Sequence, residues 1–204
     1  MNLFLENDEQ AFTYLTEYLK IAPDGEKKQL IADRVKEIGE RLEDEQTLHA
    51  AFDEMQLGNE EQALRLIQSF IAHNPRVWSG WFIRGWALRR LGDYQEAQQA
   101  FLTCLELGEQ NADIYNELSI CTLESGDREL AKSYLEIALE LDQKNVKLLS
   151  NLAFLQLQDE QYNQVYELML QAKAIDPDDP AVKHLQQELA KRTGMEEEDD
   201  IIDG

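Results

Sequence analysis

The feature that most constrains this chain is an internal repeat of fixed length. Three glycines, Gly58, Gly92 and Gly126, follow one another at equal intervals, each within a similar short run. A fourth run, Asp159-Glu160-Gln161, keeps the spacing without the glycine. Self-similarity at a fixed period of about 20–50 residues is typical of repeat architectures. Four copies without an insertion or deletion between them therefore predict one structural unit, stacked several times.

Each unit contains two helical patterns separated by a break. In the second copy, Trp81 and Gly85 share one face of a first helix, and Ala97 and Phe101 share one face of a second. Gly92 lies between them, and glycine tolerates the left-handed conformation that ends a helix, while the following aspartate can cap the next one. A lone helical hairpin cannot bury its apolar face, so neighbouring units must cover it.

This unit resembles the tetratricopeptide repeat, a helix–turn–helix of about 34 residues. The signature of that family, Trp-x2-Leu-Gly-x2-Tyr followed by Ala-x3-Phe and Pro, is matched by Trp81, Gly85, Ala97 and Phe101. The second copy departs from the signature at Arg84, Leu88 and Glu109. The resemblance implies an all-α fold, an α-solenoid in which helix–turn–helix units stack into a right-handed superhelix.

The register of the repeat divides the chain into segments. The four predicted repeats span residues 44–77, 78–111, 112–145 and 146–179. Residues 180–194 predict a capping helix, because Asp179 suits an N-cap, Pro180 the first turn, and Gly194 the position after the last turn. Residues 195–204 are strongly acidic with little to bury, and we expect a disordered tail there.

Residues 1–43 predict a helical extension that departs from the period. Residues 9–21 resemble the second helix of a degenerate half-repeat. The interval from Pro23 to Pro75 exceeds one period by about half a period, enough for an extra amphipathic helix over residues 26–43. That helix would pack on the first repeat, lie in the binding groove, or face a second copy and form a homodimer, and the sequence leaves these alternatives open.

Composition excludes several classes of partner and location. The chain of 204 residues has 41 acidic and 19 basic side chains, a net charge of −22, which argues against nucleic acid or an anionic membrane as the main partner. No apolar run approaches the ~20 residues of a membrane span, and the first ten residues do not form a signal peptide. With only two cysteines in addition, we expect a cytoplasmic protein.

Residue types that carry chemistry are scattered. His49, His73 and His184 lie far apart and form no metal-binding pair, while Cys104 and Cys121 fall on predicted packing faces. The sequence has no phosphate-binding glycine loop, nucleophile elbow or Cys-x-x-Cys motif. We therefore expect no enzymatic activity, no cofactor and no bound metal.

The resemblance implies that the first helices of the repeats line a concave groove. The residues predicted to contact a partner there are Phe52, Phe82, Trp86, Arg89, Arg90, Asn116, Ile120 and Phe154. Most are apolar, as in the core of a protein interface. The second repeat is nearly neutral at −1, against −4 or −5 for the others, and it holds all three tryptophans. Whether this groove is open or covered by the N-terminal helices is left open.

One groove chemistry known in the family is absent. Some members clamp a C-terminal carboxylate with Lys and Asn side chains on successive first helices. The matching positions here are Leu48, Phe52, Ile83, Asp113 and Glu117, none of which is basic or an asparagine. We therefore do not expect this chain to bind acidic chaperone tails.

The sequence thus predicts a protein–protein adaptor whose groove binds an apolar peptide or helix. The alternative is a dedicated chaperone that holds a hydrophobic client segment and resembles the acidic tetratricopeptide secretion chaperones. A self-assembling scaffold is a third hypothesis, and the polar capping helix at 180–194 argues against it.

Overall fold

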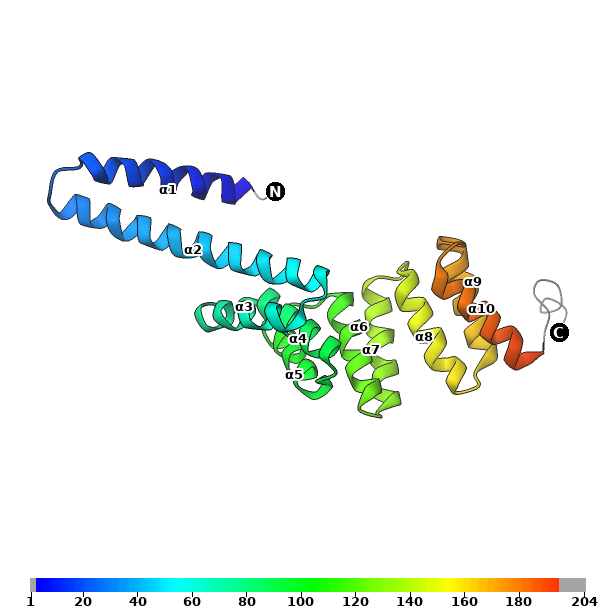
Figure 1. Ribbon diagram of the computed structural model, residues 1–204. Coiled ribbons are helices and arrows are strands. Elements are labelled where there is room, and N and C mark those ends of the chain that lie inside the picture. The colour runs from blue at the N-terminus through cyan, green and yellow to red at the C-terminus, as the bar shows by residue number, and fades with distance from the viewer. Residues whose placement is uncertain (1–2, 195–204) are drawn as a thin grey trace. The chain divides into compact units, whose positions relative to one another are not determined.

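The computed structural model describes residues 3–194, and in this range the chain forms ten helices and no strand (Figure 1). The predicted all-α fold is confirmed. The chain divides into two compact units, residues 1–87 and 88–204, and each is described by itself. No helix in the described range is long and apolar enough to cross a membrane. The predicted acidic tail, residues 195–204, lies outside the described residues.

The first unit is built on a long helical hairpin. Its helices are α1 (Leu3–Ile21), α2 (Glu26–Leu57), α3 (Glu60–His73) and most of α4 (Trp78–Leu91). Helix α1 lies antiparallel to the first half of α2, and α3 packs on the second half (Figure 1). The core of this unit consists of Ala51, Met55, Ala63, Ile67, Phe70, Ile83 and Ala87.

Helix α2 differs from the expectation of a separate helix over residues 26–43, because it continues unbroken to Leu57. The added segment corresponds to about five turns at about 3.6 residues per turn, so lengthening the first helix of the repeat preserves its faces. No proline interrupts the helix. Its one glycine, Gly39, faces α1, where an added Cβ would come within 3.0 Å of the Phe12 ring. The division of residues 1–43 into a half-repeat and an extra helix therefore stays a prediction.

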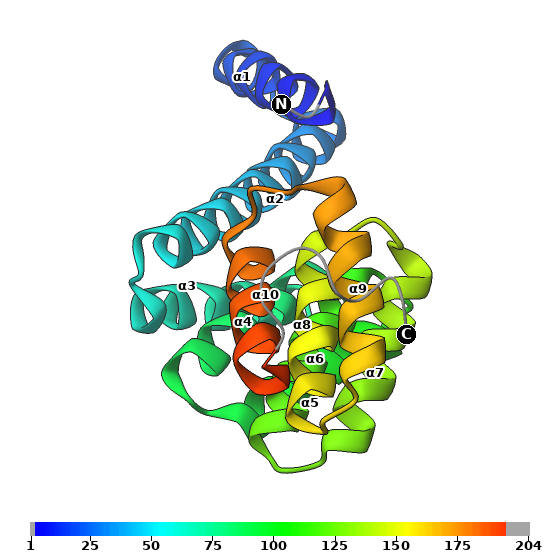
Figure 2. The same cartoon turned by 90° about the vertical axis from the view of Figure 1, so that its right-hand side faces the viewer.

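The second unit contains helical hairpins and the capping helix. After the end of α4 its helices are α5 (Tyr94–Glu106), α6 (Ala112–Glu124), α7 (Arg128–Leu141), α8 (Val146–Gln158), α9 (Tyr162–Ile175) and α10 (Pro180–Thr193). Helix α10 packs on α8 and α9 (Figure 2). It begins and ends as predicted. Asp179 Oδ1 accepts from the backbone N–H groups of Ala181 and Val182, and Gly194 adopts a left-handed conformation.

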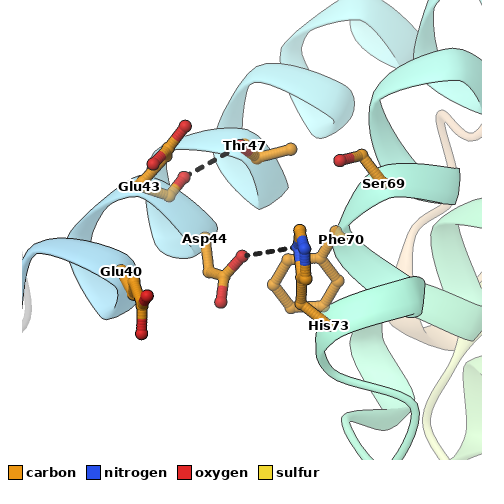
Figure 3. A pocket seen from close by; sticks show the side chains of 7 residues that line it. All are labelled: Glu40, Glu43, Asp44, Thr47, Ser69, Phe70 and His73. Atoms are coloured by element: carbon orange, nitrogen blue, oxygen red, sulfur yellow. Dashed lines mark hydrogen bonds and ion pairs between the residues drawn. The ribbon is translucent and has the colours of Figure 1, made fainter. Parts of the chain in front are cut away.

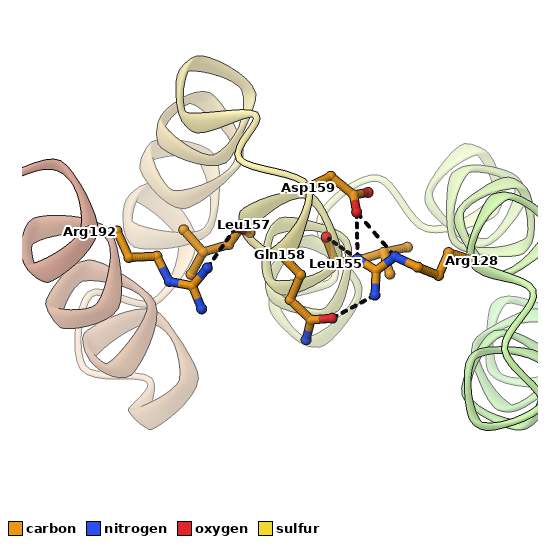
Figure 4. A network of polar contacts seen from close by, with 6 residues as sticks. All are labelled: Arg128, Leu155, Leu157, Gln158, Asp159 and Arg192. Carbon is orange, nitrogen blue, oxygen red and sulfur yellow. Dashed lines mark hydrogen bonds and ion pairs between the residues drawn. The ribbon is translucent and has the colours of Figure 1, made fainter.

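Two arginines hold the C-terminal end of α8 between its neighbours (Figure 4). From α7, Arg128 donates to the Asp159 carboxylate at 2.6 Å and to the Leu155 carbonyl oxygen at 3.2 Å. From α10, Arg192 donates to the Leu157 carbonyl oxygen at 3.1 Å. The last carbonyl groups of a helix have no partners within it and carry partial negative charge, so cationic donors stabilise this end.

The turn inside each hairpin repeats the same backbone conformation. Gly58, Gly92 and Gly126 all have positive φ angles, of 80°, 88° and 91°. Glu160 occupies the same position in the fourth repeat with φ of 58°, and it is the one non-glycine residue with positive φ in the described range. After the turn, the cap predicted at Asp93 is wrong, because its side chain makes no capping bond, whereas Asp127 of the next repeat accepts from the Leu130 N–H.

We predict that Glu160→Gly stabilises the protein. A left-handed conformation costs a non-glycine residue about 1–2 kcal/mol, partly offset by the greater flexibility of glycine in the unfolded chain. The expected gain is about 0.5–1 kcal/mol, a rise of a few degrees in the thermal midpoint measured by circular dichroism. The matched control, Gly126→Ala, should lower the midpoint. A lower midpoint for Glu160→Gly would show that the glutamate side chain stabilises this turn.

Candidate functional site

An aromatic pair connects α2 and α4 in the first unit. The rings of Phe52 and Trp86 lie 6.0 Å apart between centroids and are tilted by 48°. Phe52 keeps 45% of its surface exposed, and half-buried Trp86 packs against the core of the unit. Phe82, the third predicted site residue of this unit, makes an edge contact with Trp78 at 6.3 Å. The structure therefore joins Phe52 to Trp86 in a partly exposed apolar patch.

A polar cleft, which the sequence did not indicate, lies between α2 and α3 (Figure 3). It has a volume of about 470 Å³ and is lined by Glu40, Glu43, Asp44, Thr47, Ser69, Phe70 and His73. His73 Nδ1 lies 3.8 Å from Asp44 Oδ1, and the Thr47 hydroxyl donates to the Glu43 carbonyl oxygen at 2.8 Å. The carboxylates make this cleft acidic, and no group of side chains in residues 3–194 has the arrangement of a metal site.

Arg89, in the second unit, directs its charge into the protein. Its guanidinium forms an ion pair with the buried carboxylate of Glu117 on α6, and Lys147 Nζ lies 3.9 Å from the same carboxylate. The pair offsets part of the cost of burying Glu117. Arg90, the next predicted site residue, is exposed.

Two predicted residues, Ile120 and Phe154, line one cavity in the second unit. The cavity has a volume of about 140 Å³ and lies among α6, α7 and α8. Its full lining is Ser119, Ile120, Leu123, Ala131, Leu135, Asn151, Phe154, Leu155 and Gln158. On the side of the capping helix, the ring of His184 lies 5.4 Å from that of Phe154. The two residues are exactly one period apart in the sequence, and the repeat thus brings them to adjacent first helices.

Asn116, the remaining predicted residue, is only 1% exposed. Its Oδ1 accepts a hydrogen bond from Asn151 Nδ2 at 2.7 Å, while its own Nδ2 has no hydrogen-bond partner among the described residues. Sequence reasoning did not select Asn151. The sequence did contain a signal for Asn151, namely its place in the repeat. Asn151 follows Asn116 by one position more than the period, so the two amides lie on neighbouring first helices.

The sequence comparisons agree with this geometry. Two family profiles described as tetratricopeptide repeat match residues 50–112 and 122–189. The chain belongs to the tetratricopeptide repeat family. Repeats of this family are generally protein–protein interaction modules without enzymatic activity, so the fold supports an interaction scaffold. A comparison with curated proteins finds no match.

Solved structures with the same fold are distant in sequence. PilF of Pseudomonas aeruginosa is 17% identical with a TM-score of 0.68, covering 93% of this chain and 85% of its own. MamA of Desulfovibrio magneticus RS-1 is 23% identical with a TM-score of 0.65, covering 74% and 86%. YrrB, described as a TPR protein with an unusual peptide-binding site, is 14% identical with a TM-score of 0.58, covering 71% and 84%. These likenesses show the tetratricopeptide fold alone.

Both cysteines should be inert in the folded protein. Burial raises the pKa of Cys104 and of Cys121 to about 12, and the thiolate is the reactive form of cysteine. We predict that Ellman's reagent at pH 8 labels neither thiol within an hour in buffer and labels both in guanidinium chloride. Rapid labelling of the native protein would contradict the buried positions of these side chains.

Proposed function

We propose that this tetratricopeptide repeat protein is a non-enzymatic adaptor that binds an apolar segment of a partner protein. The observation that carries the proposal is the partly exposed contact between Phe52 and Trp86. Aromatic side chains that are already held in place contribute large contact areas at low entropic cost, and tryptophan is enriched among residues that dominate binding energy.

The second unit offers a separate apolar surface for the same kind of segment. Ile120 and Phe154 are half-buried at the cavity among α6, α7 and α8, so each retains exposed surface. A role as a dedicated chaperone would use the same two surfaces, and it would differ in holding one client segment before release.

We predict that truncating the aromatic pair weakens binding without unfolding the protein. The probe is a set of 12-residue peptides selected on the full chain from a random display library, which should be rich in large apolar residues. Trp86→Ala should weaken their binding about thirtyfold, as removal of ~2 kcal/mol does, and Phe52→Ala should weaken it several-fold. Isothermal titration calorimetry measures the affinities, and circular dichroism reports folding.

The matched control is Leu57→Ala, because Leu57 is a 73% exposed apolar residue of the same unit outside the aromatic pair. Its peptide affinity should equal that of the unmodified protein. Equal affinities for Trp86→Ala and Leu57→Ala would place the binding surface elsewhere. Unfolding of Trp86→Ala together with unchanged binding by Phe52→Ala would make Trp86 a core residue and would refute the proposed patch.

The N-terminal hairpin is the surface that we assign to a second copy of the chain. Tyr14 and Ile21 are spaced one heptad apart on α1 and are 74% and 81% exposed, and Leu30 on α2 is 70% exposed. Among the described helices of the first unit, α1 packs extensively only on α2. A hairpin of this length, ~28 Å, presents a face large enough for a dimer at the small end of stable interfaces. Pairing of two hairpins would cover these side chains in a four-helix bundle.

We predict that the full chain is a dimer by multi-angle light scattering at micromolar concentration, with twice the chain mass of 23.6 kDa. The triple substitution Tyr14→Ser, Ile21→Ser and Leu30→Ser should give a folded monomer, because serine removes the apolar area without adding charge. Leu57→Ser is the control and should remain a dimer. A monomeric unmodified chain at 100 micromolar would refute the assignment.

A further inference from the structure

The N-terminal hairpin has a defined register between its two helices. An added Cβ on Gly39 of α2 would come within 3.0 Å of the Phe12 ring of α1. Four residues away on α1, the Asp8 carboxylate forms an ion pair with Arg41 of α2 at 2.8 Å. Residues 8–12 therefore lie beside residues 39–41. Because both helices rise by about 1.5 Å per residue, these two contacts fix the level of every other residue along the hairpin.

The exposed apolar side chains of the hairpin form one short patch. Counted from the two contacts, Ile21 and Leu30 lie at the same level near the loop, and Tyr14 lies about 10 Å further from the loop. At about 100° per residue, all three point to the same side of the hairpin. The centre of the patch is close to the level of residue 34, and a twofold axis that buries the patch between two copies passes near this level.

Two arrangements of the copies would bury this patch. In a parallel pair each residue meets the same residue of the other copy. In an antiparallel pair Tyr14 of each copy meets Ile21 and Leu30 of the partner subunit. Apolar contact does not distinguish the two arrangements, because both cover the same side chains.

The charges along the hairpin distinguish them. The half next to the loop, residues 17–36, has five basic and four acidic side chains, a net charge of +1. The other half, residues 7–16 and 37–46, has one basic and seven acidic side chains, a net charge of −6. A parallel pair sets two halves of −6 side by side at helix spacings of about 10 Å, close to the screening length in physiological salt. An antiparallel pair sets each acidic half against the nearly neutral half of the other copy, which removes this repulsion.

We propose that two copies of the chain pair through their N-terminal hairpins in an antiparallel arrangement, and that the dimer is therefore a bivalent adaptor with one aromatic patch toward each end. The proposal rests on the homodimer of the proposed function and specifies its geometry. Phe52, which contacts Trp86, lies 18 residues along α2 from the axis near residue 34. The two patches are then about 54 Å apart along the hairpins, so that one dimer can hold two separate partner segments.

Distances between spin labels test the arrangement in the full chain. Gln46→Cys and Asp53→Cys each introduce one exposed site in the first unit, and buried Cys104 and Cys121 do not take up the label. We expect distances between copies of about 36 Å for residue 46 and about 57 Å for residue 53 by pulsed electron paramagnetic resonance. Light scattering checks that the labelled chains remain dimers. Distances below about 25 Å at both positions, as helices of a parallel pair require, would overturn the proposal.

A change of charge gives an independent test. Glu40→Lys with Glu43→Lys reduces the acidic half from −6 to −2. In the antiparallel pair this half faces a nearly neutral surface, and the dissociation constant of the dimer should stay within threefold of that of the matched control, measured by sedimentation at low salt. The control is Glu136→Lys with Glu140→Lys, which makes the same change at exposed positions on α7. Tightening by tenfold or more relative to this control would reveal facing acidic halves and would overturn the proposal.

The possible failures are distinguishable. A parallel dimer would refute the arrangement and leave the homodimer intact. A monomeric chain would refute both the arrangement and the homodimer. In either case the adaptor function would still be decided by the dependence of peptide binding on Trp86.

Discussion

The fold depends on close contact between the two helices of a hairpin at one small residue. Ala63 and Ala131 occupy equivalent positions near the start of the second helix of their hairpins, and each is fully or almost fully buried. A side chain of this size lets two backbones approach, while the larger residue one turn later, such as Ile67 or Leu135, fills the space beside the crossing. In the fourth repeat this position is occupied by Val165, so the crossing there accommodates a larger, β-branched side chain. Everything that the first helices present to a partner is positioned by this contact.

The regular part of the fold could be read from the sequence because its signals are local. The period locates the hairpin turns, and Asp179, Pro180 and Gly194 mark the ends of the capping helix without reference to distant residues. The continuity of α2 was harder to predict, because a surplus of about half a period fits both a separate helix and about five added turns. In the structure, Gly39 of α2 faces the Phe12 ring of α1, a long-range contact that the sequence pattern does not contain.

The predicted site shows the same division between local and long-range information. Helical spacing identifies the face of each first helix, and the structure brings Ile120 and Phe154 to one cavity. Helical spacing does not determine how deeply each side chain is buried. Asn116 was expected on the surface of the groove and is buried, and Arg89 was expected to meet a partner and instead pairs with Glu117. Both outcomes depend on which side chains the neighbouring repeat brings close, and a single helix does not contain that information.

Buried polar atoms without hydrogen bonds are unevenly distributed in the described residues. Apart from Thr16 in α1, they belong to the first helices α4, α6 and α8, on Arg89, Asn116, Glu117, Ser150 and Gln156. The second helices α3, α5, α7 and α9 contain none, and their buried side chains are almost entirely apolar. An unpaired buried polar group costs about 1–3 kcal/mol, although Arg89 and Glu117 recover part of this as an ion pair. Stability alone would favour apolar residues at Asn116, Ser150 and Gln156.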